Sequence, residues 1–330
     1  MKISTGFRML GAAAVLAAGL AAPAAAQKAI TLGTSSIGSS FYVVSIAISK
    51  MASKHENLNV AVESVGGSHA NMFGIARGKI DFATANSSAV YDLYNGKKPF
   101  KKAFDVRLVA QGHPTLRWFI ATKRSGITRL EDIDNKTISS IRRPLPELKE
   151  VMDVMEKVFG MKGIKHVASS TSRELDGQLR AGSVDGALMP FSLRQPVITK
   201  LFRDDMIEPL ILSDAQFDKV FNALPPKFFK LVVPANNFKN QPKAFPVLGL
   251  NAVMVTTMKM DEDTVYKMLR SFMNHQKEFS TFHGAAKFWN PQRATLSPPV
   301  PFHPGAIKYY KEAGMWTSKL EALQAKLLKK

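Results

Sequence analysis

Short apolar segments alternate with amphipathic segments along most of the chain. Runs of apolar and β-branched residues predict strands, and apolar positions three or four residues apart predict helices. Over residues 40–54, for example, Phe41, Val44 and Ile48 form one apolar stripe. Strands that alternate with helices are typical of a fold with a largely parallel sheet. The pattern therefore predicts an α/β architecture.

The predicted elements fall into two blocks and a closing segment. The first block has strands over 29–32, 58–65 and 80–85, helices over 40–54, 68–77 and 88–94, and extended pieces over 106–111 and 118–122. The second has strands over 137–141 and 185–189 and helices over 146–159 and 171–180, the last opening with a capping-box spacing. The segment 224–246, rich in Pro, Asn and Lys, is interpreted as a surface connection. A strand over 247–256 and helices over 261–278, 306–315 and 320–329 close the chain.

A short motif occurs once in each block. Gly78 and Gly182 each end a predicted helix, and Asp81 and Asp185 each follow three residues later and lead into a strand. The repetition indicates two domains of similar construction. A chain of 330 residues is also longer than one hydrophobic core usually supports.

The first 26 residues have the three parts of a secretory signal peptide. Lys2 and Arg8 are positive, residues 9–20 are apolar, and three alanines precede Gln27. The apolar run is too short to span about 30 Å of hydrocarbon. We therefore expect cleavage after Ala26 and a mature protein in the periplasm.

The composition narrows the possible partners. The chain contains no cysteine, so it can form no disulfide and carry no lipid on a cysteine. Its formal charge is +19, or +17 without residues 1–26. Lysines cluster at 97–102 and 326–330, but no zinc-ligand pattern or RNA-binding aromatic motif accompanies them. We expect no nucleic-acid partner, and interpret the charge as a solvated surface or as a field that attracts anionic solutes.

Three small polar turns, residues 33–40, 66–68 and 86–88, each connect a predicted strand to a predicted helix. The carboxyl ends of parallel strands share one edge of a sheet, so the turns would lie together and present the free N–H groups of three helix starts. Their serines are either ordinary helix caps or part of a pocket for a carboxylate. Because three such turns share the edge, we favour the pocket.

Enzyme signatures are mostly missing. Gly33 and Gly38 have the spacing of a phosphate-binding loop, but Ser39 stands where its lysine is required. The seven histidines show no metal-ligand spacing. We expect no catalytic residue, metal or cofactor. A hydrolase that pairs a serine from 35–40 with His113 is an alternative, and it requires the two side chains within hydrogen-bond reach.

Two further places carry candidate chemistry. Arg142 and Arg143 follow the first strand of the second block. They would either grip a carboxylate in bidentate fashion or form a solvated pair. His113 lies at the passage between the two predicted domains, as an ordinary loop histidine or as a ligand-facing side chain.

Four stretches resemble the TAXI family of solute receptors, which serve TRAP transporters. They are residues 32–42, 62–81, 85–96 and, most specifically, 301–314, which begins Pro-Phe-His-Pro-Gly. The likeness covers nearly all of the chain after the signal peptide and is weak from about 203 to 246. It implies a bilobed type II periplasmic binding-protein fold with two Rossmann-like lobes. One lobe would comprise 27–115 and 245–330, and the other 116–244.

The resemblance also implies that solute binds between the lobes and passes to the membrane subunits of a TRAP permease. Ligands of such receptors are small, often carboxylates such as glutamate or a dicarboxylate. We expect a monomer. The positions that match the family's pocket-lining turns are Ser36, Gly38, Ser39, Tyr42, Gly67, Ser68, Asn86 and Ser87. The expected ligand-binding set is completed by Ser35, Phe41, His113, Arg142 and Arg143.

The segment 141–146, which reads Ile-Arg-Arg-Pro-Leu-Pro, departs from the family. The family usually carries a turn rich in Gly and Ser after the corresponding strand. A bulkier, cationic wall indicates a different and more acidic solute than glutamate. A receptor that passes its closed form to a membrane sensor, for signalling, is an alternative to transport.

Overall fold

The computed structural model describes residues 29–143, 145–190, 196–238 and 241–329. The expected signal peptide, residues 1–26, lies outside the described residues. The elements in chain order are β1 (Ile30–Thr34), α1 (Ser40–Glu56), β2 (Val60–Ser64), α2 (Ser68–Ala76), β3 (Phe82–Asn86), α3 (Ser87–Tyr94), β4 (Val106–Thr122), η1 (Lys123–Ser125), η2 (Leu130–Ile133), β5 (Thr137–Ile141), α4 (Glu147–Phe159), β6 (Lys165–Ala168), α5 (Ser172–Ala181), β7 (Gly186–Met189), α6 (Pro196–Arg203), β8 (Ile207–Pro209), α7 (Asp214–Ala223), β9 (Phe229–Val233), β10 (Phe245–Thr257), α8 (Glu262–Met273), α9 (Gln276–Phe279), η3 (Ala286–Phe288), α10 (Pro291–Ala294), α11 (Pro304–Glu312) and α12 (Ser318–Leu328).

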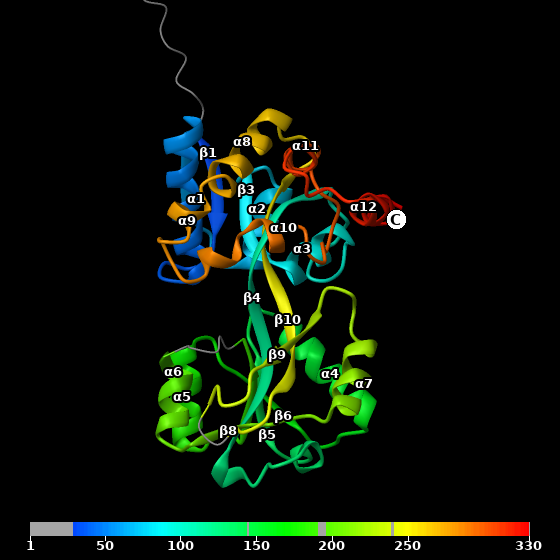
Figure 1. Ribbon diagram of the computed structural model, residues 1–330. Helices are drawn as coiled ribbons and strands as arrows, with labels where there is room; N and C mark the ends of the chain where they lie inside the picture. Colours follow the sequence, from blue (N-terminus) through cyan, green and yellow to red (C-terminus); the bar gives the residue numbers. More distant parts are fainter. Residues whose placement is uncertain (1–28, 144, 191–195, 239–240, 330) are drawn as a thin grey trace, which may run out of the picture.

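The strands follow the order β2-β1-β3-β10-β4-β7-β5-β6, with β8 paired to β4 and β9 paired to β10. β1 is parallel to β2 and β3, and β5 is parallel to β6 and β7. β4 and β10 run antiparallel to each other and to their other neighbours. Figure 1 shows these two long strands passing between a first group of elements, α1–α3 and α8–α12, and a second group, α4–α7. The predicted α/β architecture is confirmed.

The buried apolar side chains form two clusters. The first draws on residues 32–110 and 252–310, and the second on residues 116–250. In the second, Trp118 stacks on Phe238 with ring centroids 5.0 Å apart. β4 and β10 contribute side chains to both clusters, so these two strands connect the first group to the second.

The repeated Gly–Asp motif makes the same contact in both groups. The Asp81 carboxylate accepts a hydrogen bond of 2.8 Å from the backbone N–H of Thr31 in β1. The Asp185 carboxylate accepts one of 2.8 Å from the backbone N–H of Thr137 in β5. Each aspartate therefore ties a helix-to-strand turn to the neighbouring parallel strand.

Three predicted elements differ from the observed ones. The extended pieces 106–111 and 118–122 are one strand, β4, because β10 pairs with β4 from Val106 to Arg117, across the predicted gap, and shifts register next to the Pro114–Asn251 pair. β7 and β8 pair with the rest of β4. The segment interpreted as a surface connection contains β9, whose alternate residues are exposed and which pairs with β10. The helix predicted over 261–278 ends at Met273, and α9 follows as a separate short helix.

Candidate functional site

The turn before α1 places a serine against His113. Ser39 caps the helix, because its Oγ accepts a hydrogen bond of 3.1 Å from the backbone N–H of Tyr42. Ser40 is the first helical residue, and its Oγ lies 3.1 Å from Nε2 of His113 in β4. Phe41 packs edge-on against the His113 ring, with centroids 5.0 Å apart. The serine–histidine proximity that the hydrolase alternative requires is therefore present.

His113 is nevertheless not in the state of a general base. The indole N–H of Trp289 can only donate, and it lies 3.0 Å from His113 Nδ1, so Nδ1 is an acceptor. Burial first, and then the neighbouring His283 and Arg293, lower the pKa of His113 to about 3. The ring is thus neutral at pH 7 and carries its proton on Nε2, which donates to Ser40. A histidine that already donates to a serine cannot remove that serine's proton.

The other two turns use their polar side chains within the fold. Asn86 Oδ1 accepts a hydrogen bond of 2.9 Å from the N–H of the third residue of α3. Ser68 Oγ accepts one of 2.9 Å from the N–H of Asn86. Ser87 Oγ accepts one of 3.2 Å from the N–H of Asn251 and donates to the Lys227 carbonyl at 3.4 Å. These side chains therefore cap and connect elements, and a ligand at this edge would meet mainly backbone N–H groups.

A buried carboxylate from the second group meets this edge. Glu147 is the first residue of α4, and its Oε1 accepts hydrogen bonds from Arg117 Nη2 at 2.5 Å and Asn86 Nδ2 at 3.4 Å. The side chains of Arg117 and Glu147 are 2% and 0% exposed. Among the described residues, Glu147 Oε2 has no hydrogen-bond partner. Glu147 therefore joins β4, α4 and the start of α3.

Arg142 is a half-buried cation close to this pair. Its pKa is lowered, first by burial and then by the positive charge of Arg117, while Glu147 acts in the opposite direction. Its Nε is buried and has no hydrogen-bond partner within the described part of the chain. The positive charge of Arg142 is therefore only partly compensated by its surroundings, and an anion placed beside it would be stabilised.

Lys227, between α7 and β9, connects the two groups through an ion-pair cluster. Its Nζ lies 3.0 Å from Asp92 Oδ1 in α3 and 2.7 Å from Glu150 Oε2 in α4, and its side chain is 2% exposed. His69 Nε2 lies 3.5 Å from the other Asp92 oxygen. Burial disfavours the charged lysine, but the two carboxylates outweigh it, and the pKa of Lys227 is raised. One ammonium group therefore ties α3 to α4.

The predicted ligand-binding residues occupy three kinds of environment. The structure leaves Ser36, Gly38 and Arg143 exposed. The half-buried residues are Ser35, Ser39, Phe41, Tyr42 and Arg142, and the buried ones are Gly67, Ser68, Asn86, Ser87 and His113. Arg142 and Arg143 thus differ, since only Arg142 lies in the charged cluster. Contact of any of these residues with a solute stays a prediction.

Sequence reasoning missed the charged residues Arg117, Glu147, Lys227 and Asp92. Their partners lie 30 residues away along the chain for Arg117 and 135 for Lys227. Periodicity places a residue on a strand or helix but does not pair it with a distant one. The one available signal is the charge of Arg117 beside the otherwise apolar run 118–121.

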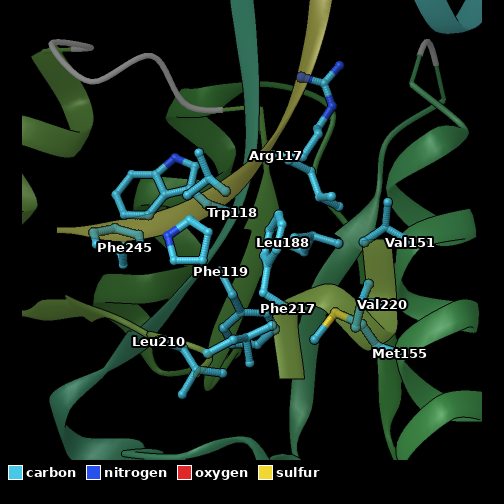
Figure 2. Close-up of a pocket in the computed structure, with 14 residues that line it drawn as sticks. Arg117, Trp118, Phe119, Val151, Met155, Leu188, Leu210, Phe217, Val220 and Phe245 are labelled. Atoms are coloured by element: carbon cyan, nitrogen blue, oxygen red, sulfur yellow. The ribbon is translucent and has the colours of Figure 1, made fainter. Parts of the chain in front are cut away.

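A small apolar cavity of about 40 Å³ lies in the second hydrophobic cluster. Figure 2 shows Arg117 extending away from this cavity, whose lining comes from β4, α4, β7, α7 and β10. Its labelled apolar lining residues are Trp118, Phe119, Val151, Met155, Leu188, Leu210, Phe217, Val220 and Phe245. Pockets for small molecules usually measure about 300 Å³ or more, so this cavity is a packing void.

The described residues contain neither a candidate metal site nor a candidate membrane-spanning helix. No group of three or more His, Cys, Asp or Glu side chains there could hold a metal ion. None of the helices found there is both long and apolar enough to cross a membrane.

Known proteins share this architecture. The sequence model of the NMT1-like family matches residues 32–314. MatC from Rhodopseudomonas palustris, solved with bound malate, is 14% identical, and the match covers 88% of this chain and 98% of MatC with a TM-score of 0.53. A structure described as a periplasmic transporter is 13% identical over 93% of this chain and 98% of its own, with a TM-score of 0.51. These likenesses show the type II periplasmic binding-protein fold.

Proposed function

We propose that this chain, which belongs to the NMT1-like family, is a TAXI-type receptor that binds one small carboxylate-bearing solute in the periplasm. The lobes would be residues 27–115 with 245–330, and residues 116–244. The solute would sit between them, and the loaded monomer would deliver it to the membrane subunits of a TRAP permease. The two separate core clusters and the two strands that connect them support a hinge at this boundary.

The charge arrangement where the two groups meet carries the proposal. The parallel strands β1, β2 and β3 bring the starts of α1, α2 and α3 to one sheet edge. Asn86 at this edge contacts Glu147 of the second group, next to Arg142. Helix N-termini and an incompletely compensated arginine together favour a carboxylate. A solute that also bears an ammonium or hydroxyl donor could satisfy Glu147 Oε2, which belongs to the same cluster.

The state of His113 supports a receptor over a hydrolase. Its Nε2 proton points at Ser40, so the pair lacks a base on the side where a nucleophile needs one. The same hydrogen bonds instead fix the start of α1 to β4 and Trp289. The pair therefore positions a helix start rather than activating a hydroxyl group.

Isothermal titration calorimetry tests the proposal. The protein is unfolded and refolded to remove bound solute, then titrated with glutamate, aspartate and C4 and C5 dicarboxylates. Arg142→Gln is expected to weaken binding about 10- to 100-fold, the loss of one charge-assisted interaction. Arg143→Gln, at the exposed neighbour, is the matched control and should leave the affinity nearly unchanged.

Mass spectrometry of molecules released from natively purified protein complements the titration. An acidic molecule released in amounts stoichiometric with the protein supports the proposal. No heat with any acid, together with no acidic molecule in the released fraction, would overturn it. Binding that survives Arg142→Gln but fails in Arg143→Gln would refute the assigned position of the carboxylate.

A further inference from the structure

Six lysines form a basic patch on the first group, apart from the proposed solute site. Within the described part of the chain none of the six forms an ion pair, and all are exposed. Tyr94 at the end of α3 donates a hydrogen bond of 2.9 Å to the carbonyl of Leu327 in α12, which brings two distant segments together. Figure 1 shows α12 at the outer edge of the first group. The patch consists of Lys97, Lys98, Lys101 and Lys102, between α3 and β4, and of Lys326 and Lys329, at the end of α12.

The loop that carries four of these lysines is anchored from within. Phe100, in the middle of the lysines, is 5% exposed and lies 4.7 Å from the Phe73 ring, centroid to centroid. Its backbone N–H donates to the Lys97 carbonyl at 2.9 Å, and the N–H of Phe104 donates to the Leu93 carbonyl at 3.1 Å. The loop therefore holds its charges toward solvent before any partner arrives, and little order has to be gained on binding.

An exposed apolar side chain lies at the same end of α12. Leu328, the last residue of the helix, is 48% exposed and precedes Lys329 in the chain. Lysines together with an exposed apolar side chain match a bilayer surface, where anionic headgroups lie above the acyl boundary. All six cations are lysine, whereas binding of individual carboxylates or phosphates in a fork favours arginine. The lysine ammonium is a compact charge on a flexible side chain, and it fits the spread-out negative charge of a bilayer surface.

We propose that this basic patch binds the anionic headgroups of a phospholipid bilayer. The binding is independent of the solute site. If the proposed function also holds, it would concentrate the receptor at the membrane that contains its permease, and so raise the effective concentration of the two partners.

Co-sedimentation of the mature chain with vesicles tests the proposal. The probes are phosphatidylcholine vesicles with and without phosphatidylglycerol. Binding is expected only to the anionic vesicles and should weaken as salt is raised, because salt screens exposed charges. No sedimentation with anionic vesicles at low salt, or equal sedimentation with both compositions, would overturn the proposal.

Two variants with the same loss of charge separate a local patch from net charge. Each lysine near an anionic surface contributes about fivefold to partitioning, so four substitutions should weaken partitioning by about 600-fold. The control substitutions lie at exposed lysines of the second group and should have a far smaller effect. Equal losses in the two variants would refute the patch. The patch variant is K97Q/K98Q/K101Q/K102Q, and the control variant is K157Q/K162Q/K165Q/K219Q.

A second patch variant covers the case in which the first fails to fold, which circular dichroism would detect. K326Q/K329Q alters only the end of α12 and should weaken partitioning about 25-fold by the same estimate. Leu328→Ser keeps every charge. Compared with the unsubstituted protein, it should reduce vesicle binding more at high salt than at low salt, because the apolar contact then contributes the larger share. Unchanged partitioning of K326Q/K329Q would show that α12 does not take part, contrary to the proposal.

Discussion

Replacing Lys227 by methionine removes the ammonium group that ties α3 to α4 and keeps an unbranched side chain of similar size. Asp92 would then remain buried at 6% exposure without its cation. Glu150 is 35% exposed and keeps contact with water. The substitution therefore leaves one uncompensated buried charge and one partly solvated charge.

The expected magnitude follows from this difference. Two unit charges 4 Å apart attract by about 4 kcal/mol at an effective dielectric constant of about 20. Desolvation of the buried partners offsets much of this gain, but loss of one partner alone costs about 3–5 kcal/mol. We therefore expect Lys227→Met to lower the free energy of unfolding by about 3 kcal/mol.

Urea unfolding followed by circular dichroism measures this change, in a double-mutant cycle with Asp92→Asn. The double variant should lose less than the sum of the single losses by at least about 1.5 kcal/mol, because it leaves no unpaired charge at Asp92. The matched control is Lys230→Met. Lys230 pairs with Asp218 on the surface, so its loss should cost less than about 1 kcal/mol. Equal losses in the two lysine variants, or additive effects in the cycle, would refute the argument from burial.

Two further predictions concern stability. The lowered pKa of His113, about 3, means that the neutral ring is favoured in the fold. The full free energy of unfolding is present above the unfolded histidine pKa of about 6.5. As pH falls toward 3, protonation of the unfolded chain lowers that free energy by at most about 5 kcal/mol. His113→Gln should flatten this acid dependence in urea titrations, and an unchanged slope would contradict the assignment. Val220→Ile adds a methyl group toward the cavity of about 40 Å³ and should raise the free energy of unfolding by about 0.5–1 kcal/mol; a lower Tm would show that the added group does not fit.

The sequence patterns that predict the fold correctly are local ones. The motif that ends at Asp81 and recurs at Asp185 indicates two similar units, and both aspartates accept a backbone hydrogen bond from the neighbouring strand. The predictions fail where a distant partner decides the structure. β4 is continuous through Pro114 because β10 pairs with it on both sides and shifts register there. β9 forms in a Pro- and Lys-rich segment because the edge of β10 is available to it.

The candidate site divides in the same way. The turn serines and asparagines are visible in sequence because capping acts over three residues, as Ser39 and Asn86 show. The charged cluster is not visible, because burial of Glu147 and Lys227 arises only when the two groups of elements meet. A sequence shows which side chains carry charge, but tertiary packing decides which charges lose water and which find partners.

The contrast between helix-capping turn residues and buried charged residues affects how the proposed receptor would select its solute. Ser39 and Asn86 cap helices, and Ser68 and Ser87 accept backbone N–H groups, so these side chains are largely committed to the fold. In the proposed site, the first lobe would then offer a solute mainly the N–H groups of three helix starts, which attract negative charge but discriminate poorly between anions. Arg142 belongs to the segment 141–146, where the sequence departs from the family it resembles. The choice of solute should therefore depend mainly on the second lobe, and substitutions there should change specificity while those in the turns of the first lobe change stability.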